Sequence, residues 1–322
     1  MTDTTAMSVP VLAGSPEPAA APTRHAPDAG TLWRPSAPCA PRTCTGAGGP
    51  TRLPALAALR FAAVLFLLLA GCLAHLAAGL LGRHLPAGAV RLWCRWVVRA
   101  CGVRPRIDGA AAPDGGLLLV ANHVSWLDIP LIAAVRPARM LAKSEIRAWP
   151  VAGRLTARGG ALFIDRDRVR ALPATVARIA AALRSGDAVA VFPEGSTWCG
   201  RARGRFRRAA FQAALDAGVP VQPVRLDYRR ADGETATAAA FVGDDTLLAS
   251  VWRVASTRGL TAEVRVARPI APGSHPDRAR LARAAETAVL PPEHPAPVPG
   301  PRRIVFGPRP GVLPATGEAL TA

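Results

Sequence analysis

Residues 105–290 are predicted to fold as an α/β domain in which helices flank a mixed, largely parallel sheet. Two observations predict this class. From Gly116 onward, short apolar runs alternate with segments that are long enough to be helices. The runs are continuously apolar instead of alternating with polar residues, which is typical of strands that are covered on both faces. The active site of such a sheet lies beyond the carboxyl ends of its strands, so catalytic residues are expected there.

Six strands and two helices can be placed along this region. The apolar runs predict the strands, and longer segments between them predict the helices. The helices cover 171–184 and 206–217, and the strands cover 117–122, 139–143, 161–165, 188–193, 219–226 and 262–267.

The segment 56–104, which precedes the domain, is predicted to bind a membrane. Residues 61–81 contain no Asp, Glu, Lys or Arg, and these 21 residues are about enough to cross a hydrocarbon core. A cleaved signal peptide and a buried core helix are the alternatives for this stretch. Arginines are nearly equal in number on its two sides, so their distribution gives no orientation.

The stretch 90–103 predicts an amphipathic helix. Arg91, Arg95 and Arg99 are four residues apart and share one stripe, while an apolar stripe that includes Trp93 falls largely on the other side. A basic helix that carries tryptophan lies flat on anionic membranes. The alternative is a surface helix that packs on the domain.

Composition limits the class of partner. The net charge is +18, and 39 of the 40 basic residues are arginine. A surface this basic attracts acidic lipid headgroups, acidic carrier proteins, phosphorylated substrates or nucleic acid. Half of the residues are apolar, which excludes a wholly disordered chain. The ends differ, because 18 of the 32 prolines lie in 1–50 and 291–322, so 1–55 and 291–322 are predicted to be disordered.

The six cysteines are not expected to form a metal site. No CxxC pair occurs and the histidines are scattered, so the spacing indicates no cluster of metal ligands. Two cysteines lie in the Pro-rich leader and one in the apolar stretch. No disulfide framework is predicted, and a reducing compartment fits at least as well.

The first candidate for chemistry follows the strand predicted at 117–122. His123 lies where this strand ends, and a histidine beside a carboxylate is a natural general base. Five residues on a regular helix turn by about 140°, so His123 reaches Asp128 only from a loop, with Asp128 in the first helical turn. Alternatively, Ser125 and Asp128 form an S-x-x-D pattern in which the carboxylate only caps the helix.

A second candidate follows the strand predicted at 188–193. Glu194, Gly195, Ser196 and Thr197 combine a glycine with hydroxyls, which offer donors to a phosphate or an oxyanion. An acid would repel a phosphate. Glu194 is therefore expected either to accept a hydrogen bond from a substrate hydroxyl or to hold the loop in shape.

A third candidate, Asp165 with Arg166, ends the run 161–165. The two side chains can pair as a surface salt bridge, or the planar guanidinium of Arg166 can clamp an anionic substrate. A basic run nearby is either a solvated face or a landing site for an acidic headgroup or carrier: Arg201, Arg203, Arg205, Arg207 and Arg208.

Four motifs in order resemble the 1-acylglycerol-3-phosphate acyltransferase family of phospholipid biosynthesis. They are NHVSWLD at 122–128, GALFIDR at 160–166, FPEGST at 192–197 and VPVQPV at 219–224. The resemblance implies the glycerolipid acyltransferase fold for the domain. It also implies that His123 takes the proton from a lysophospholipid hydroxyl and that Asp128 orients His123.

The same resemblance implies which residues hold the acceptor. These are Arg166, the loop 194–197 and Lys143, which lies in AKSEI where such enzymes often carry a basic residue near the acceptor phosphate. The chain departs from the family at one point. Many members have Glu-Gly-Thr followed by Arg or Ser, whereas here Ser196 precedes Thr197, so the acceptor headgroup is left open.

The sequence therefore predicts a membrane-associated acyltransferase with its catalytic domain facing the cytoplasm and an anionic membrane surface. Its expected donor is acyl-CoA or acyl-carrier protein, and its expected acceptor is a lysophospholipid, above all 1-acylglycerol 3-phosphate, which gives phosphatidic acid. No cofactor is implied. The alternatives are an acyltransferase for another lysolipid such as a lyso-ornithine lipid, a hydrolase, or a basic nucleic-acid-binding protein. The chain has no G-x-S-x-G motif for a hydrolase, and its arginines are not interleaved with aromatic residues as RNA binding would require.

Overall fold

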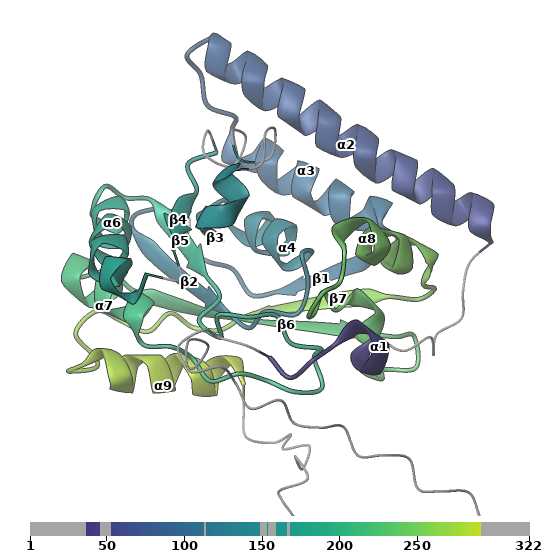
Figure 1. Ribbon diagram of the computed structural model, residues 1–322. Helices are drawn as coiled ribbons and strands as arrows, with labels where there is room; N and C mark the ends of the chain where they lie inside the picture. The colour runs from purple at the N-terminus through teal and green to yellow at the C-terminus, as the bar shows by residue number, and fades with distance from the viewer. Residues whose placement is uncertain are drawn as a thin grey trace, which may run out of the picture. The chain divides into compact units, whose positions relative to one another are not determined.

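Seven strands form one mixed sheet in the part of the chain that the structure describes (Figure 1). The structure is a computed structural model, and it describes residues 37–45, 53–112, 114–148, 153, 159–165 and 168–290. The strands are β1 (Arg104–Asp108), β2 (Leu117–Ala121), β3 (Arg139–Lys143), β4 (Leu162–Ile164), β5 (Ala188–Val191), β6 (Val221–Arg229) and β7 (Thr261–Val266). Their order is β1-β7-β6-β2-β5-β3-β4, and neighbours are parallel except β6 and β7. The predicted class, a largely parallel sheet with helices, is confirmed.

Helices cover both faces of this sheet. The described α-helices are α1 (Pro41–Cys44), α2 (Pro54–Leu80), α3 (Ala87–Ala100), α4 (Asp128–Val135), α6 (Leu172–Arg184), α7 (Ala209–Ala217), α8 (Leu247–Ser256) and α9 (Arg278–Val289). Leu117 and Leu119 of β2 join a buried cluster with α3, α4 and α8, while Leu118 and Val120 join another with α6, α7 and α9. Every residue of β2 is buried, which explains why its sequence is continuously apolar.

Helix α2 is longer than the apolar stretch from which it was predicted. It has 27 residues, its most apolar window has a mean hydropathy of 2.4, and 11% of that window is buried. By length and composition it can cross a membrane. Such low burial does not fit the alternative of a buried core helix.

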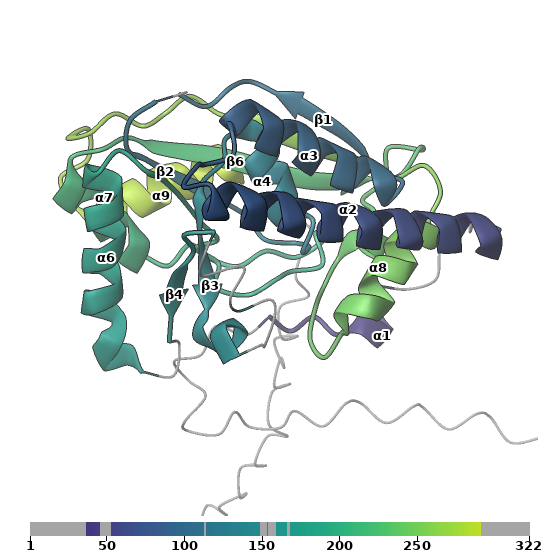
Figure 2. The same ribbon diagram turned by 90° about the horizontal axis from the view of Figure 1, so that it is seen from above.

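One side of α2 packs on α3 and α8 (Figure 2). Trp93 Nε1 of α3 donates a hydrogen bond to the carbonyl of Leu67 on α2, at 3.0 Å. The Trp93 ring packs directly on Gly71, because a Cβ atom at this position would overlap the ring. The glycine inside this apolar helix is therefore a packing feature.

Helix α3 is amphipathic, as predicted, and packs on the domain. Val97 and Val98 are buried, whereas Trp96 is 51% exposed. The arginine stripe is exposed: Arg91, Arg95 and Arg99. The packed surface helix, the alternative for 90–103, is therefore observed, and its outer side carries the arginines and a tryptophan.

Three elements, β1, α8 and α9, were not predicted from the sequence. β1 was missed because its residues alternate between exposed and half-buried positions, so it has no continuous apolar run. Its backbone pairs in parallel with β7. The sequence does contain an N-cap residue for α9. The Asp277 side chain accepts hydrogen bonds from the backbone of Ala279 and Arg280, at 2.7 and 2.8 Å.

Part of the predicted leader is structured. Residues 37–45 include α1, and Ala37 and Cys39 pack in the first buried cluster. Composition could not reveal this because only a few apolar side chains make the contact. The rest of 1–52, and all of 291–322, lie outside the described residues.

Candidate active site

The site begins where β2 ends, near the middle of the sheet. His123 lies in the loop two residues after Ala121, and Asp128 is the first residue of α4. Their side chains meet, with His123 Nδ1 2.8 Å from Asp128 Oδ2. This is the loop and first-turn arrangement that the five-residue spacing requires.

The Asp128 carboxylate is held from several directions. Its side chain has an exposed fraction of 0%. Oδ2 also accepts hydrogen bonds from the backbone of Val124, at 2.7 Å, and of Ser125, at 2.8 Å. Asp128 therefore serves both of its expected roles. The same oxygen that contacts the His123 ring also accepts backbone hydrogen bonds from the residues just before α4.

A third side chain, Tyr228 of β6, completes this network. Its hydroxyl donates to Asp128 Oδ1 at 2.6 Å. Burial raises the pKa of Tyr228 well above its ordinary value, and the charge of Asp128 adds to this rise, so the hydroxyl keeps its proton. Tyr228 was not predicted to be a site residue. Its signal was weak: Tyr228 is the one tyrosine of the chain and continues the buried alternation of Val224 and Leu226.

Stacking also fixes one face of the His123 imidazole ring. Its ring stacks on Phe192, with ring centroids 4.0 Å apart and planes at 9°. With Nδ1 held by Asp128, Nε2 is the nitrogen left to meet a substrate proton. The His123 side chain is 20% exposed, so a substrate can reach it.

Glu194 shapes the loop around His123. The residue is 4% exposed, Oε2 accepts from the backbone of His123 at 2.7 Å, and Oε1 accepts from the backbone of Gly204 at 2.9 Å. Burial raises the pKa of Glu194 to about 7, against these two hydrogen bonds, which lower it. Both oxygens bind the backbone, which favours loop shaping over contact with a substrate hydroxyl.

The rest of this loop lies beside the histidine. Gly195 has a φ of +76°, which a glycine adopts easily, and its N–H donates to the carbonyl of Phe192 at 3.0 Å. The N–H of Trp198 donates to the carbonyl of His123 at 2.8 Å. Ser196 and Thr197, between these two anchors, are half-buried.

Lys143 and Arg166 are the other residues predicted to hold the acceptor. Lys143 ends β3, is exposed and lies opposite Ile164 of β4. Arg166 lies outside the described residues. The structure pairs Asp165 with Arg168, at 3.5 Å. No described contact joins Lys143 to the His123–Asp128 pair.

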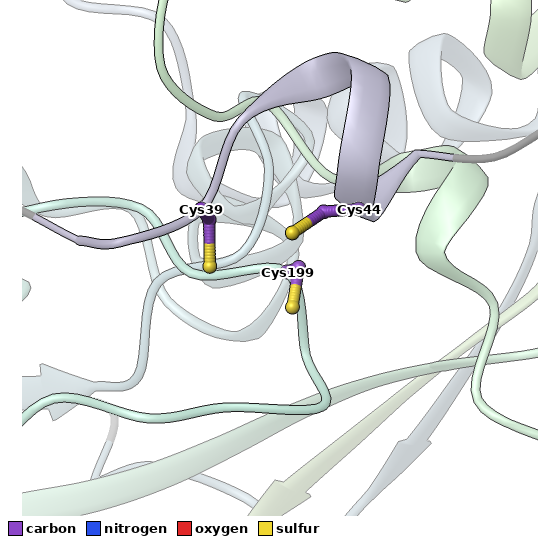
Figure 3. A group of neighbouring side chains, drawn as sticks. All are labelled: Cys39, Cys44 and Cys199. Atoms are coloured by element: carbon purple, nitrogen blue, oxygen red, sulfur yellow. The ribbon is translucent and has the colours of Figure 1, made fainter. Parts of the chain in front are cut away.

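Three cysteines gather near this loop, contrary to the sequence analysis. The sulfur atoms of Cys39, Cys44 and Cys199 all lie within 4.8 Å of one another (Figure 3). The spacing of the cysteines in the sequence did not indicate this cluster of sulfur atoms. Spacing could not reveal the cluster, because two members come from the leader and one from the loop after β5.

Comparisons with known proteins identify related acyltransferases. A family profile described as Acyltransferase matches residues 103–227. A lyso-ornithine lipid O-acyltransferase of Pseudomonas aeruginosa is 42% identical over 202 residues, which cover 62% of this chain and 77% of that protein. A 1-acyl-sn-glycerol-3-phosphate acyltransferase of Neisseria gonorrhoeae is 39% identical over 158 residues, which cover 48% of this chain and 62% of that protein. The crystal structure of the 1-acyl-sn-glycerophosphate acyltransferase of Thermotoga maritima has the same fold, with a TM-score of 0.50 and 21% identity, and covers 63% of this chain and 76% of that chain.

Proposed function

This chain belongs to the acyltransferase family, and on that premise we propose that it transfers a fatty acyl group from an acyl thioester to the free hydroxyl of a lysolipid. The observation that carries the proposal is the contact between His123 Nδ1 and Asp128 Oδ2. Family membership sets aside the hydrolase and the nucleic-acid-binding protein.

The proposed mechanism starts at Nε2 of His123. With its Nδ1–H donated to Asp128, the imidazole presents the Nε2 lone pair to the acceptor hydroxyl and takes its proton. The hydroxyl oxygen attacks the thioester carbonyl, and the thiolate leaves with the proton from Nε2. No acyl-enzyme is needed because the thioester is already activated, and the mechanism uses no cofactor.

The fixed carboxylate has a definite part in this mechanism. Four hydrogen-bond donors surround Asp128: the His123 ring, the backbone of Val124 and Ser125, and the Tyr228 hydroxyl. They prevent the carboxylate from rotating, so the ring keeps one orientation. The charge of Asp128 then stabilises the imidazolium that forms when Nε2 is protonated.

For the acceptor, the first candidate is a lyso-ornithine lipid. The relative of that name is more similar to this chain and is covered to a greater extent than the relative named for 1-acylglycerol 3-phosphate. The second candidate is 1-acylglycerol 3-phosphate, which the motifs of the sequence favour. Lys143 and Arg166 fit both, since a carboxylate and a phosphate are each matched by a basic side chain.

The donor is acyl-CoA or acyl-carrier protein. Both are anionic and present the acyl group as a thioester. Exposed arginines after the Glu194 loop supply a basic surface for either one: Arg201, Arg205, Arg207 and Arg208.

We further propose that α2 and α3 hold the domain on an anionic membrane, with the domain on the cytoplasmic side. Phe66 and Leu69 of α2 are 69% and 60% exposed, and Trp96 of α3 is 51% exposed. A deletion of residues 1–82 should release much of the protein from membranes, and high salt should release more by screening the α3 arginines. Sedimentation of membranes at low and high salt measures both effects. Unchanged, salt-resistant attachment of the deletion variant would contradict the roles of both helices.

The function is tested with detergent-solubilised full-length protein and both thioester donors. The acceptors are lyso-ornithine lipid, 1-acylglycerol 3-phosphate and a lysolipid with a zwitterionic headgroup. We expect one thiol to be released per ester formed, with lyso-ornithine lipid the best acceptor and His123→Ala inactive. Preference for 1-acylglycerol 3-phosphate would select the second candidate. Thiol release without ester formation would contradict acyl transfer.

A further inference from the structure

The cluster of Cys39, Cys44 and Cys199 lies outside the proposed chemistry. Cys39 and Cys44 lie on the leader segment 37–45, and Cys199 lies on the loop that follows β5 (Figure 3). None of the three is in a disulfide. Cys39 and Cys199 are 6% and 4% exposed, and Cys44 is half-buried. The cluster is therefore largely shielded from solvent but open at Cys44.

We propose that these three thiolates bind a soft metal cation of the Zn²⁺ class and that the bound ion ties the leader to the catalytic domain. A Zn–S bond of about 2.3 Å places the sulfurs of a tetrahedral site about 3.8 Å apart. The three sulfurs already lie within 4.8 Å of one another, so small side-chain rotations are enough to close them around an ion. Thiolates select this class of cation over hard cations such as Mg²⁺.

Binding of a cation by the cluster releases one proton from each cysteine that becomes a ligand. The Thr43 hydroxyl lies 3.7 Å from Cys44 Sγ, so the third ligand has a polar neighbour. A water molecule is the fourth ligand that we expect.

The backbone around the cluster is packed closely enough to hold the ligands in place. Gly243 has a φ of +61°, and a Cβ atom there would lie 3.2 Å from the carbonyl oxygen of Cys39 and 3.2 Å from Cδ of Pro41. The small residue lets the leader approach the loop before α8. The Thr43 hydroxyl also lies 3.2 Å from the carbonyl of Ala40, to which it donates, so the turn that carries Cys39 and Cys44 is fixed locally.

The position of the cluster connects it to the proposed active site. Trp198, the neighbour of Cys199, donates its N–H to the carbonyl of His123 at 2.8 Å. The same loop carries Glu194, which binds the backbone of His123 and Gly204. A cation at Cys199 would therefore restrain the loop that positions His123.

Metal titration of the full-length protein tests this proposal directly. The detergent-solubilised chain is reduced, stripped with a chelator and titrated with Co²⁺, whose thiolate complexes absorb by sulfur-to-metal charge transfer. We expect one equivalent of Co²⁺ to bind, Zn²⁺ to displace it, and elemental analysis to find one zinc per untreated chain. Cys44→Ser should lose the charge-transfer band, and Cys72→Ser, a change on α2, should keep it.

The design remains decisive if some variants do not fold. Cys44 is the most exposed of the three, so its variants are the least disruptive, and Cys44→His should recover Co²⁺ binding through a nitrogen ligand. In the unmodified chain, added Zn²⁺ should raise the Tm by mass action, and it should not do so in Cys44→Ser. A disulfide between two of these cysteines in the isolated metal-free protein would overturn the proposal, as would Co²⁺ binding that survives Cys44→Ser. Because these readouts do not depend on acyl transfer, they stand or fall separately from the proposed function.

Discussion

The two sides of the candidate site differ in how firmly the fold holds them. On the side of the histidine, the Asp128 side chain is fully buried and accepts four hydrogen bonds from two separate parts of the chain, the loop 123–125 and Tyr228. On the side of β3 and β4, Lys143 is exposed and Asp165 pairs with a nearby exposed arginine. A proton transfer requires geometry fixed to fractions of an ångström, whereas a flexible lipid headgroup can be bound by exposed charges. The difference suggests that the buried side sets the rate and the exposed side sets the choice of acceptor.

The largest effect is expected from removing the general base. His123→Ala should lower kcat by about a hundred- to ten-thousandfold, because Nε2 is the group that takes the hydroxyl proton. The fold should survive, since His123 is partly exposed and Glu194 binds its backbone, not its ring. Acyl transfer and Tm are measured on the same preparation. Near-normal turnover by a folded variant would end the proposed mechanism.

Asp128→Asn should be milder but still severe. The amide has only one oxygen, so either Tyr228 loses its acceptor or His123, Val124 and Ser125, which share Oδ2, lose theirs together, and the imidazolium loses its counter-charge in both cases. We expect a loss of roughly ten- to a thousandfold in kcat. Tyr228→Phe is the matched comparison, since it removes one donor to Asp128 but keeps the charge. If Asp128→Asn lowered only the Tm, the carboxylate would be a helix cap and nothing more.

Glu194, on the buried side of the site, should make the stability of the protein depend on pH. Its pKa in the folded protein is about 7, above the ordinary 4.5, because burial disfavours the charged form. Between these two values the folded protein holds this proton more tightly than the unfolded chain does. Its contribution to the free energy of unfolding therefore falls as pH rises through the window, by roughly 3 kcal/mol in all.

Glu194→Gln should remove this slope. The stability advantage of the unmodified protein over the variant should be greatest near pH 4.5 and should shrink toward pH 7. Denaturant unfolding at a series of pH values measures it. Glu145→Gln, which changes an exposed glutamate, controls for the loss of one carboxylate. Parallel profiles for the unmodified protein and Glu194→Gln would show that burial does not perturb this group.

The sequence predicted the features that depend on residues close together in the chain. The strands at 117–122 and 188–193 appear within two residues of their predicted bounds, because a buried parallel strand is apolar along its whole length. The His123–Asp128 contact was foreseen because both residues lie in one short motif.

What the sequence did not predict depends on partners that lie far apart in the chain. Tyr228 reaches Asp128 across 100 positions. Cys39 and Cys44 meet Cys199 only after the leader packs on the domain. No spacing rule covers such contacts, since β6 and the loop after β5 are brought beside β2 by the order of the sheet.

The smallest effect is expected from Arg166→Ala, which tests the exposed side of the site. If Arg166 clamps the anionic group of the acceptor, its loss should raise the KM for that lysolipid by about ten- to a hundredfold, the worth of one charge-assisted contact of roughly 1.5 to 3 kcal/mol. The KM for the thioester should change little, and Arg166→Lys should recover part of the loss because it keeps the charge without the planar fork. Lys143→Ala should act in the same direction but less, as expected of a single exposed charge.

Arg170→Ala is the matched control for Arg166→Ala, since it removes an exposed arginine from the same stretch of chain. A monoacylglycerol, which has no anionic group, is the matched control substrate, and Arg166→Ala should leave its KM unchanged. If Arg166 instead forms a surface salt bridge with Asp165, both KM values should stay the same and only stability should fall slightly. Equal increases for the lysolipid and the thioester would assign Arg166 a structural role. The selectivity of the exposed side would then have to come from Lys143 and the hydroxyls of Ser196 and Thr197.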